Sequence, residues 1–297
     1  MPARVPFLLA CLLLVGGAGF ARDLPLPPGE KLVHRERSAY QTLLVTDGIT
    51  RRCLRFTEGS EGLNQSCRPH ATPDHLAFDY TRAMTAVLLL WKPPPRRVLV
   101  IGVGGGSIPT ALALVRPEMA VDAVDIDEAV LRVAQRYFGL KPGPRLRLHA
   151  ADGRDFVAKA RAAGTRYDAV LLDAFDAQGI PAPLFSEAFL RDVKEILAPD
   201  GVFMANTFAD AGAYGRESRT AEAVFGPFHN VRLGTAGGNR VLVAAKSPAM
   251  LASREALMAA LPSQGAALAR LGIEQRWVRE LRFAGRDWDI TSRASGT

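Results

Sequence analysis

An apolar run that leads straight into four glycines constrains the fold of this chain more than any other segment. Residues 97–107 read RVLVIGVGGGS, and residues 109–114 continue as the start of a helix, so the segment predicts a strand, a tight turn and a helix. Glycine lets the backbone turn at positive φ and lets a ligand lie against bare peptide, near the free N–H groups of the helix start. We therefore predict that Gly102, Gly104 and Gly106 bind a nucleotide-type ligand. The alternative is a turn that only joins strand to helix.

The residue after the last glycine bears on the kind of ligand. A dinucleotide-binding fingerprint has its third glycine at this position, where this chain has Ser107. The spacing therefore favours an S-adenosyl-type ligand over NAD.

The amino terminus differs in composition from the rest of the chain. Arg4 precedes an apolar run over residues 5–15, and small residues lead to Ala21. This pattern predicts a secretory signal over residues 1–21 and a periplasmic or secreted protein without a membrane span after cleavage. The alternatives are a membrane anchor, a lipidated Cys11, or a misassigned start codon, in which case the protein is cytoplasmic.

Two cysteines, Cys53 and Cys67, would remain after cleavage. In an oxidising compartment they are expected to pair and to close a short loop, for roughly 3 kcal/mol of stability; the alternative is two free thiols. The five histidines are dispersed, so we expect no metal site.

Charge gives a weaker constraint. The chain has 297 residues and a formal net charge of +7. Lysine and arginine are scattered and form no dense stripe with interleaved aromatic residues, so we expect no nucleic-acid partner.

The chain divides into four predicted parts. After the signal, a proline-rich linker covers residues 22–31, a small antiparallel β unit residues 32–72, and a larger domain residues 73–297. The larger domain is expected to open with a helix over residues 73–90. The expected strands that follow are 98–101, 120–124, 146–150, 169–172 and 202–206, and the expected helices are 109–115, 128–138, 155–163, 186–197 and 220–225.

This alternation predicts the α/β class, with a Rossmann-like parallel sheet covered by helices on both faces. A ligand is then expected at the carboxyl ends of the strands. Strands 231–233 and 241–245 are close enough to form a C-terminal antiparallel hairpin, and a helix over 253–261 is expected to complete the domain.

Acidic residues follow the second and third strands of this domain. Asp125 stands about 20 residues after the glycine turn, where a carboxylate can accept hydrogen bonds from both ribose hydroxyls. Asp127 is either a second ligand contact or the cap of the next helix. Asp152, followed by Gly153, is placed either to accept from an adenine amino group or to cap a helix.

Two further carboxylates, Asp173 and Asp176, follow the fourth strand. Both can converge on a bound amine, which needs an anion to hold its cationic form and a base to remove a proton. We predict that they are catalytic.

These motifs together resemble the spermidine synthase family of polyamine aminopropyltransferases. The resemblance covers residues 38–245. It implies a class I methyltransferase-like domain after a small β domain, decarboxylated S-adenosylmethionine as a co-substrate with no tightly bound cofactor, and a polyamine such as putrescine as acceptor. The matching stretches are SAYQ at 38–41, VLVIGVGGG at 98–106, VDID at 124–127, ADG at 151–153, YDAVLLD at 167–173 and PLFS at 183–186.

The family also implies roles for individual residues. Gln41 and Gly104 would lie near the donor, Asp125 on its ribose and Asp152 at its adenine, and Asp173 would free the acceptor amine. Family members commonly associate through the N-terminal β domain, so a homodimer is one state that the resemblance allows.

Three places depart from the family pattern. Ser107 stands where the glycine motif has an aspartate, residues 78–80 (FDY) replace a Tyr-His-Glu sequence, and Ala177 replaces a proline. An aminopropyl donor carries an ammonium in place of a carboxylate, so loss of an anion near it would favour ordinary S-adenosylmethionine. The leading expectation is a transferase; the alternatives are a methyltransferase and a non-catalytic exported binding protein.

Overall fold

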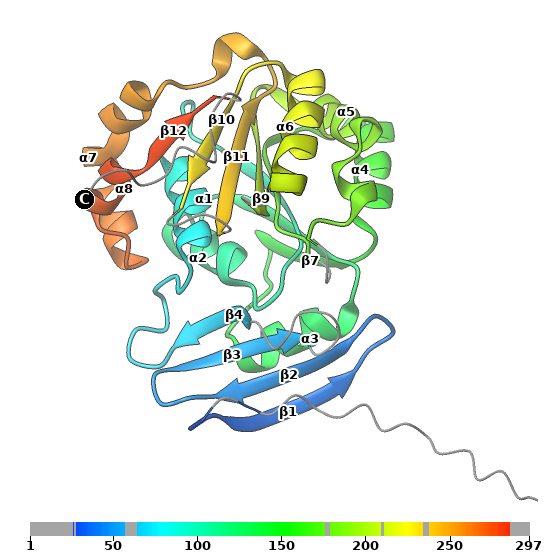
Figure 1. Cartoon of the computed structure of the whole chain (residues 1–297), viewed down its shortest axis with the longest axis vertical. Coiled ribbons are helices and arrows are strands. Elements are labelled where there is room, and N and C mark those ends of the chain that lie inside the picture. The colour runs from blue at the N-terminus through cyan, green and yellow to red at the C-terminus, as the bar shows by residue number, and fades with distance from the viewer. Residues whose placement is uncertain are drawn as a thin grey trace, which may run out of the picture.

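The computed structural model describes residues 26, 28–56, 64–175, 179–208, 211–233 and 238–285. The predicted signal, Asp176 and Ala177, and the tail after residue 285 lie outside these residues. Two sheets organise the chain (Figure 1). Among the described residues, no helix is long and apolar enough to span a bilayer.

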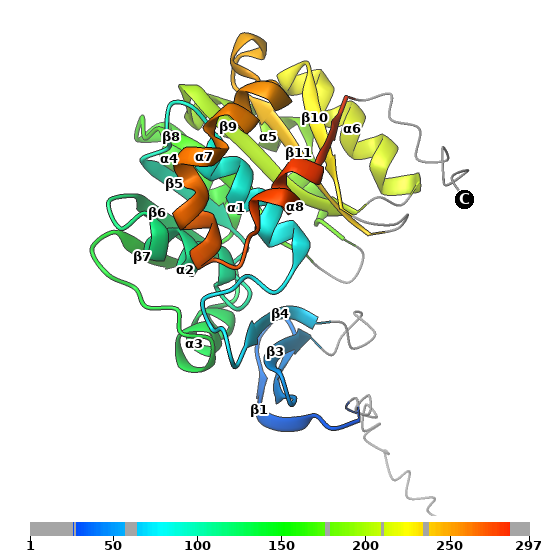
Figure 2. The same cartoon turned by 90° about the vertical axis from the view of Figure 1, so that its left-hand side faces the viewer.

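The smaller sheet is antiparallel, in the order β1-β2-β3-β4, and precedes the α/β domain as the sequence predicts. Lys31, which the sequence analysis placed in the linker, is the first residue of β1. Leu43, Val45 and Leu54 of this sheet pack against α3 (Glu128–Tyr137), and Figures 1 and 2 both place α3 beside it. The four strands are β1 (Lys31–Arg37), β2 (Thr42–Asp47), β3 (Arg51–Phe56) and β4 (Asn64–Pro69).

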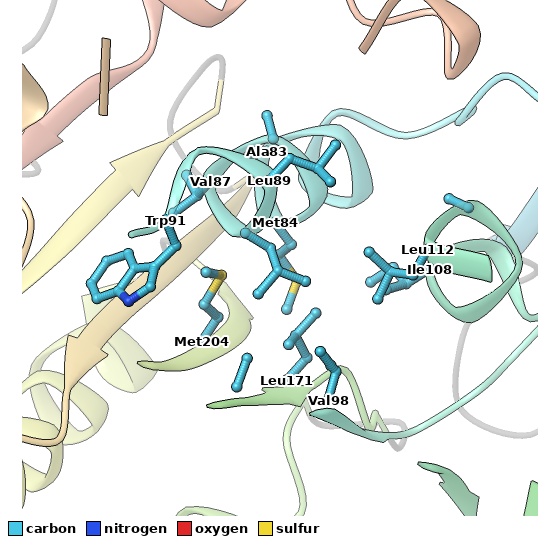
Figure 3. Packing of buried hydrophobic residues seen from close by; sticks show 14 of the residues in the cluster. Ala83, Met84, Val87, Leu89, Trp91, Val98, Ile108, Leu112, Leu171 and Met204 are labelled. Carbon is cyan, nitrogen blue, oxygen red and sulfur yellow. The ribbon is translucent and has the colours of Figure 1, made fainter. Parts of the chain in front are cut away.

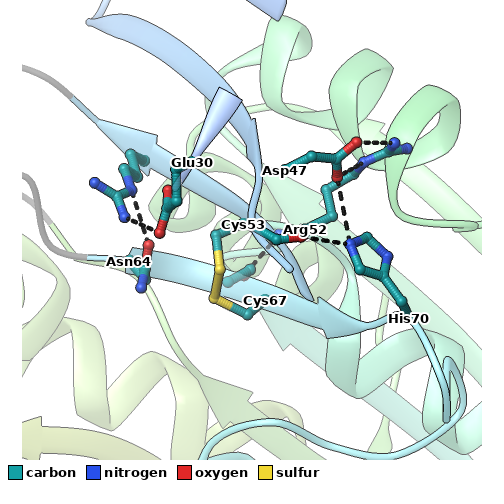
Figure 4. Close-up of a disulfide and its surroundings, with 11 residues drawn as sticks. Glu30, Asp47, Arg52, Cys53, Asn64, Cys67 and His70 are labelled. Atoms are coloured by element: carbon teal, nitrogen blue, oxygen red, sulfur yellow. Dashed lines mark hydrogen bonds and ion pairs between the residues drawn. A yellow bond between two sulfur atoms is a disulfide. The ribbon is translucent and has the colours of Figure 1, made fainter. Parts of the chain in front are cut away.

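Cys53 and Cys67 face each other across β3 and β4 and form a disulfide, with a Cα–Cα distance of 4.1 Å. The predicted pairing is therefore confirmed. Figure 4 shows ion pairs and hydrogen bonds around the disulfide, with Asp47 and Arg52 on one side of it. Arg52 donates from Nε and Nη2 to the two oxygens of Asp47, at 2.8 and 2.7 Å.

The larger sheet has eight strands in the order β12-β10-β11-β9-β8-β5-β6-β7. The five strands from β9 to β7 are parallel, and β11, β10 and β12 extend the sheet with each strand antiparallel to its neighbour. The predicted Rossmann-like sheet and C-terminal hairpin are confirmed. The strands are β5 (Arg97–Ile101), β6 (Ala120–Asp125), β7 (Leu146–Ala150), β8 (Tyr167–Leu172), β9 (Leu197–Phe208), β10 (Phe228–Arg232), β11 (Asn239–Ala245) and β12 (Arg282–Ala284).

Alternate residues of the central strands face opposite layers of helices. Val98 and Val100 of β5 belong to a core with α1, α2, α7 and α8, whereas Leu99 and Ile101 belong to a core with α4, α5 and α6. Figure 3 shows the first core around Met84. The helices are α1 (Asp79–Leu90), α2 (Ser107–Val115), α4 (Gly153–Ala162), α5 (Glu187–Ile196), α6 (Ala211–Phe225), α7 (Arg254–Arg270) and α8 (Gln275–Glu280), with 3₁₀ turns η1 (Ala182–Phe185) and η2 (Pro248–Met250).

The first helix is shorter than the sequence predicts. It begins at Asp79, and residues 73–78 are not helical. The backbone N–H of Leu76 donates to the carbonyl of Leu271 at the end of α7. Tertiary pairing with a distant segment therefore outweighs the local helical pattern.

The C-terminal part is longer than expected. The last helix was predicted to end at residue 261, but α7 continues through Pro262 to Arg270 and is followed by α8 and β12. The three residues of β12 are too few to show a strand pattern. They form a strand because they pair with β10, a tertiary contact that the local sequence does not indicate.

The order of the parallel strands fixes where a ligand can bind. The chain runs from β5 outward to β6 and β7, then returns to β8 on the other side of β5. The connections after β5 and β8 therefore leave the sheet in opposite directions and open a crevice between them. The glycine turn follows β5, and Asp173 follows β8.

Candidate active site

A cavity of about 280 Å³ lies at this crevice, along the carboxyl ends of β5, β6 and β8. The smaller sheet closes one side of it with Gln41, Phe56, Gln65 and Ser66. The other lining residues come from α1, from the ends of β5, β6, β7 and β8 with the loops and helix starts that follow them, and from the segment before α5: Tyr80, Ile101, Gly102, Val103, Gly104, Val124, Asp125, Ile126, Asp127, Val130, Ala151, Asp152, Gly153, Arg154, Asp173, Ala174, Phe175, Pro181, Pro183 and Leu184.

The predicted glycines take the conformations that only glycine adopts readily, with φ of 90° at Gly102 and 53° at Gly104. A Cβ on Gly102 would lie 2.3 Å from the carbonyl oxygen of Asp173. The glycine turn and the end of β8 are therefore in direct contact. Both glycines line the cavity.

Gly106 has a different place from the one predicted. It has a φ of 76° and precedes α2, and a Cβ there would meet the side chain of Leu140 at 3.1 Å. It lies outside the cavity wall, so its structural role is to form the turn and pack against Leu140. Ser107 also lies outside this wall and lines a separate small depression with Gly106.

The smaller sheet contacts the glycine turn directly. Ser66 Oγ accepts a buried hydrogen bond of 2.8 Å from the N–H of Gly105, and a Cβ on Gly105 would lie 2.7 Å from Ser66 Cβ. One N–H group of the turn thus binds β4 rather than a ligand. The sequence analysis missed Ser66 because a single serine in a short strand carries no signal of this contact.

Asp125, predicted to bind ribose, lines the cavity and also accepts hydrogen bonds from the backbone of the cavity wall. Oδ2 accepts from the N–H of Val103 at 2.9 Å, and Oδ1 accepts from the N–H of Asp127 at 3.0 Å. Burial raises the pKa of Asp125, and backbone hydrogen bonds from Asp127, Val103 and Gly104 oppose this rise. The carboxylate therefore ties the end of β6 to the glycine turn.

Asp127 and Asp152 each cap a helix, which is one of the two predicted alternatives. Asp127 caps α3 through a 2.9 Å hydrogen bond from the N–H of Ala129, and Asp152 caps α4 through a 2.7 Å bond from the N–H of Arg154. Both also line the cavity. Asp127 Oδ2 is buried and has no hydrogen-bond partner within the described ranges, whereas Arg154 pairs with Asp152 and holds its pKa below the usual range.

Gly153 follows Asp152 in the cavity wall, as predicted. A Cβ on this residue would lie 2.7 Å from Ile101 Cγ2. The start of α4 thereby packs closely on the end of β5.

Asp173 lies at the end of β8, where its N–H donates to the carbonyl of Ile101 at 2.7 Å. Asn206 Nδ2 donates to Asp173 Oδ1 at 2.9 Å, and a side-chain hydrogen bond joins Asp173 to Tyr80. Burial raises the pKa of Asp173 to about 7, while the hydrogen bonds from Asn206 and Tyr80 favour the charged form. A carboxylate with this pKa can accept a proton near neutral pH.

Tyr80 was not among the predicted site residues, since residues 78–80 were interpreted as a departure from the family pattern. Tyr80 nevertheless lines the cavity and contacts Asp173, with Phe78 stacked on it at 5.9 Å between ring centroids. Helical spacing alone assigns Tyr80 to the core face of α1. In the sequence, only the hydroxyl group of Tyr80, which can donate a hydrogen bond to a carboxylate, marks it as a possible site residue.

Comparison with known proteins gives the family. The sequence model of the spermine/spermidine synthase domain matches residues 77–212. A polyamine aminopropyltransferase from Vibrio vulnificus (strain CMCP6) is 36% identical over 98% of this chain and 94% of its own length.

Two solved structures are also similar. A probable spermidine synthase from Corynebacterium glutamicum has a TM-score of 0.61 and 19% identity over 83% of this chain and 92% of its own, which supports the fold. Human methyltransferase-like protein 13, in complex with SAH, has a TM-score of 0.57 and 29% identity over 73% of this chain and 97% of its own. On the near full-length match to a polyamine aminopropyltransferase, the chain belongs to the spermine/spermidine synthase family.

Proposed function

We propose that this protein transfers an aminopropyl group from decarboxylated S-adenosylmethionine to an amine such as putrescine. The observation that carries the proposal is Asp173, a carboxylate with a pKa near 7 that faces a cavity beside the glycine turn. An amine substrate arrives as an ammonium ion, so the site must first hold a cation and then accept its proton.

The donor would occupy the side of the cavity formed by the glycine turn and the ends of β6 and β7. Asp125 would accept hydrogen bonds from the ribose hydroxyls, and Asp152 would accept one from the adenine amino group. Gly104 leaves room for the ligand against the backbone, and Gln41 would approach the donor from the smaller sheet. Asp127 Oδ2, which is buried without a partner in the part of the chain described, is a further acceptor for the donor.

The reaction that this arrangement supports is an in-line displacement. Asp173 takes a proton from the acceptor ammonium, which leaves a lone pair on nitrogen. That nitrogen attacks the aminopropyl carbon next to sulfur, and the carbon–sulfur bond breaks with its electron pair going to sulfur. The sulfonium becomes the neutral thioether 5′-methylthioadenosine, the attacking nitrogen becomes a secondary ammonium ion, and Asp173 releases the proton it took to solvent. Asp176 is proposed as a second anion for the acceptor.

The direct test is product formation by the purified protein from decarboxylated S-adenosylmethionine and putrescine. We expect spermidine and 5′-methylthioadenosine in equal amounts. Asp173→Asn should keep donor affinity and lose turnover by 100-fold or more, because it preserves shape and removes the base. The matched control is Asp192→Asn on α5, where Asp192 forms an exposed ion pair with Arg161 of α4. Wild-type turnover by the Asp173 variant would refute the assignment.

A methyltransferase is the second candidate, and a specific observation favours it. Human methyltransferase-like protein 13, solved with SAH, is 29% identical over 73% of this chain. The glycine motif ends in the neutral Ser107, where the family pattern has an aspartate, so this position supplies no anion to an aminopropyl ammonium. Methyl transfer from S-adenosylmethionine to an amine, with no reaction of the decarboxylated donor, would decide for this candidate.

Location is a separate proposal. We infer that residues 1–21 are a cleaved export signal and that the mature protein begins at Arg22. The disulfide supports this inference, because disulfides persist mainly in oxidising compartments. An exported protein that binds neither adenosyl donor would be the non-catalytic alternative. Intact-mass analysis of the native protein should give Arg22 as the first residue and a mass two units lower before reduction. An intact Met1 would contradict export.

We also propose a homodimer formed through the smaller sheet. The proposal is supported by exposed apolar side chains that a partner could cover: Leu32 and Val33 on β1, and Tyr40 and Ile49 in the connections of this sheet. Light scattering should give twice the chain mass, and Leu32→Lys should reduce it to the monomer mass. A monomeric wild-type protein at micromolar concentration would refute the dimer.

A further inference from the structure

Two asparagines behind the cavity connect the outer hairpin to Asp173. Asn239 Nδ2, on β11, donates to Asn206 Oδ1, on β9, at 3.0 Å, and Asn206 Nδ2 donates to Asp173 Oδ1 at 2.9 Å. Asn206 is 2% exposed, and neither asparagine lines the cavity. They can therefore act on a substrate only through Asp173.

The order of these hydrogen bonds fixes which end of Asn206 faces Asp173. A carboxamide donates from its nitrogen and accepts at its oxygen. Because Asn239 donates to the Asn206 oxygen, the Asn206 nitrogen faces the carboxylate. A donor at this position favours the charged form of Asp173, whereas an oxygen would repel it.

Asn239 is itself held in place by the strand that carries it. It pairs with Phe208 in the β9–β11 register. The next residue, Arg240, is fully buried and donates from Nη2 to Glu217 Oε2 at 2.9 Å and from Nε to Thr207. This anchor prevents β11 from sliding along β9.

We propose that Asn239 is a positioning residue for the transfer reaction: through Asn206 it keeps the Asp173 carboxylate oriented and ionised for proton transfer from the acceptor amine. The catalytic part of this inference rests on the proposed function. The hydrogen-bond arrangement and its effect on Asp173 do not.

Other charged groups also surround Asp173. Tyr80 reaches it from α1, and the rest of the cavity wall carries Asp125 and Asp127 at the end of β6. Further charge comes from the Asp152–Arg154 pair on α4 and from the Arg240–Glu217 pair beside Asn239. The variants below leave all of these groups unchanged. Asn239→Ala adds no charge, so a change in the titration of Asp173 in that variant reports on the hydrogen bonds of the two asparagines, whereas the carboxylate added in Asn239→Asp also raises the midpoint by repulsion.

The variant with the largest expected effect is Asn239→Asp. The new carboxylate accepts but does not donate, so Asn206 should turn end for end, donate to it and present oxygen to Asp173. We expect the midpoint of the Asp173 titration, followed by carboxyl ¹³C NMR and assigned by its loss in Asp173→Asn, to rise by about one pH unit or more. Asn239→Ala removes the donor without adding an acceptor and should give a smaller rise. Asn64→Asp, on β4 outside the cavity wall, is the control for the chemical change and should give none.

The rate profile provides the second readout. A rise of about one pH unit from a midpoint near 7 should lower kcat at pH 7 about fivefold and leave kcat near that of the wild type at pH 9. An equal loss of kcat at every pH, or an unchanged Asp173 titration in folded Asn239→Asp or Asn239→Ala, would overturn the inference. The alanine variant decides the matter if the aspartate variant does not fold. If the wild-type protein transfers no aminopropyl group, the proposed function fails, and the NMR titration still tests the effect on Asp173.

Discussion

Ser66 accepts a 2.8 Å hydrogen bond from the backbone N–H of Gly105, and this bond joins the N-terminal sheet to the glycine turn. The two residues are 39 positions apart in the sequence. The sheet that precedes the α/β domain therefore helps to set the shape of the donor side of the cavity.

Ser66→Ala should weaken both the fold and donor binding. It leaves the buried Gly105 N–H without an acceptor, which costs about 1–3 kcal/mol of unfolding free energy. Urea unfolding and calorimetric titration with 5′-methylthioadenosine measure the two effects. Ser263→Ala, which removes a hydroxyl that donates to Ala260 on α7, is the control for donor binding. Unchanged affinity in a destabilised Ser66 variant would show that the contact is only structural.

Asp125→Ala should weaken binding of any adenosyl ligand. The carboxylate would lose ligand hydrogen bonds worth about 1.5–3 kcal/mol each and would no longer brace Val103 and Asp127. The dissociation constant of 5′-methylthioadenosine should rise more than tenfold. A rise below about threefold would place the ribose elsewhere.

Loss of the disulfide should destabilise the smaller sheet. Cys53 and Cys67 are 14 residues apart, and a crosslink over such a loop contributes about 3 kcal/mol. Cys53→Ser with Cys67→Ser should therefore unfold at lower urea concentration than the wild type. Because Ser66 adjoins Cys67 in the sequence, we also expect weaker binding of 5′-methylthioadenosine. The reduced wild-type protein should match the double variant, and identical stability of oxidised and reduced forms would contradict this expectation.

Asp173 and Asp122 should make opposite contributions to the pH dependence of the free energy of unfolding. Burial raises the pKa of Asp173 to about 7, above its unfolded value, so its native form binds the extra proton and stability falls as pH rises from about 4 to 7. Burial alone would also raise the pKa of Asp122, but hydrogen bonds from Arg147, His149 and Tyr167 lower it to about 2. Its stabilisation is therefore complete above about pH 4 and is lost as pH falls toward 2.

The matching variants separate the two effects. At pH 8, Asp173→Asn should be more stable than the wild type by more than about 1 kcal/mol, whereas Asp122→Asn should be less stable, because it weakens a buried charge network. At pH 3 each variant should be closer to the wild type in unfolding free energy than it is at pH 8. Thermal unfolding across this pH range measures them, and lower stability of Asp173→Asn at pH 8 would contradict the direction assigned to Asp173.

The sequence predicts the parts of the site that follow directly from a strand end. Gly102, Asp125 and Asp173 are each close to the end of a β-strand, and the parallel order of the strands brings them together. Tyr80 and Asn206 could not be found in this way, because each reaches Asp173 from an element that the local pattern assigns only to the core.

Spacing also could not separate capping from ligand binding at Asp127 and Asp152. One carboxylate has two oxygens, and the structure places these residues at a helix start that is also the cavity wall. The capping interpretation is confirmed, and the ligand contact remains a prediction. The structure does not place Gly106 at the predicted ligand site. Its positive φ forms the start of α2, and the residue packs against Leu140 outside the cavity wall.

The close approach at Gly102 limits how this chain can change over evolution. A methyl group on its α-carbon would collide with the carbonyl of Asp173. Any other residue at position 102 would therefore push the glycine turn away from Asp173. Pro181, Pro183 and Leu184 also line the cavity and take no part in this contact. Substitutions of these three side chains can therefore reshape the cavity while Gly102 and Asp173 stay in contact.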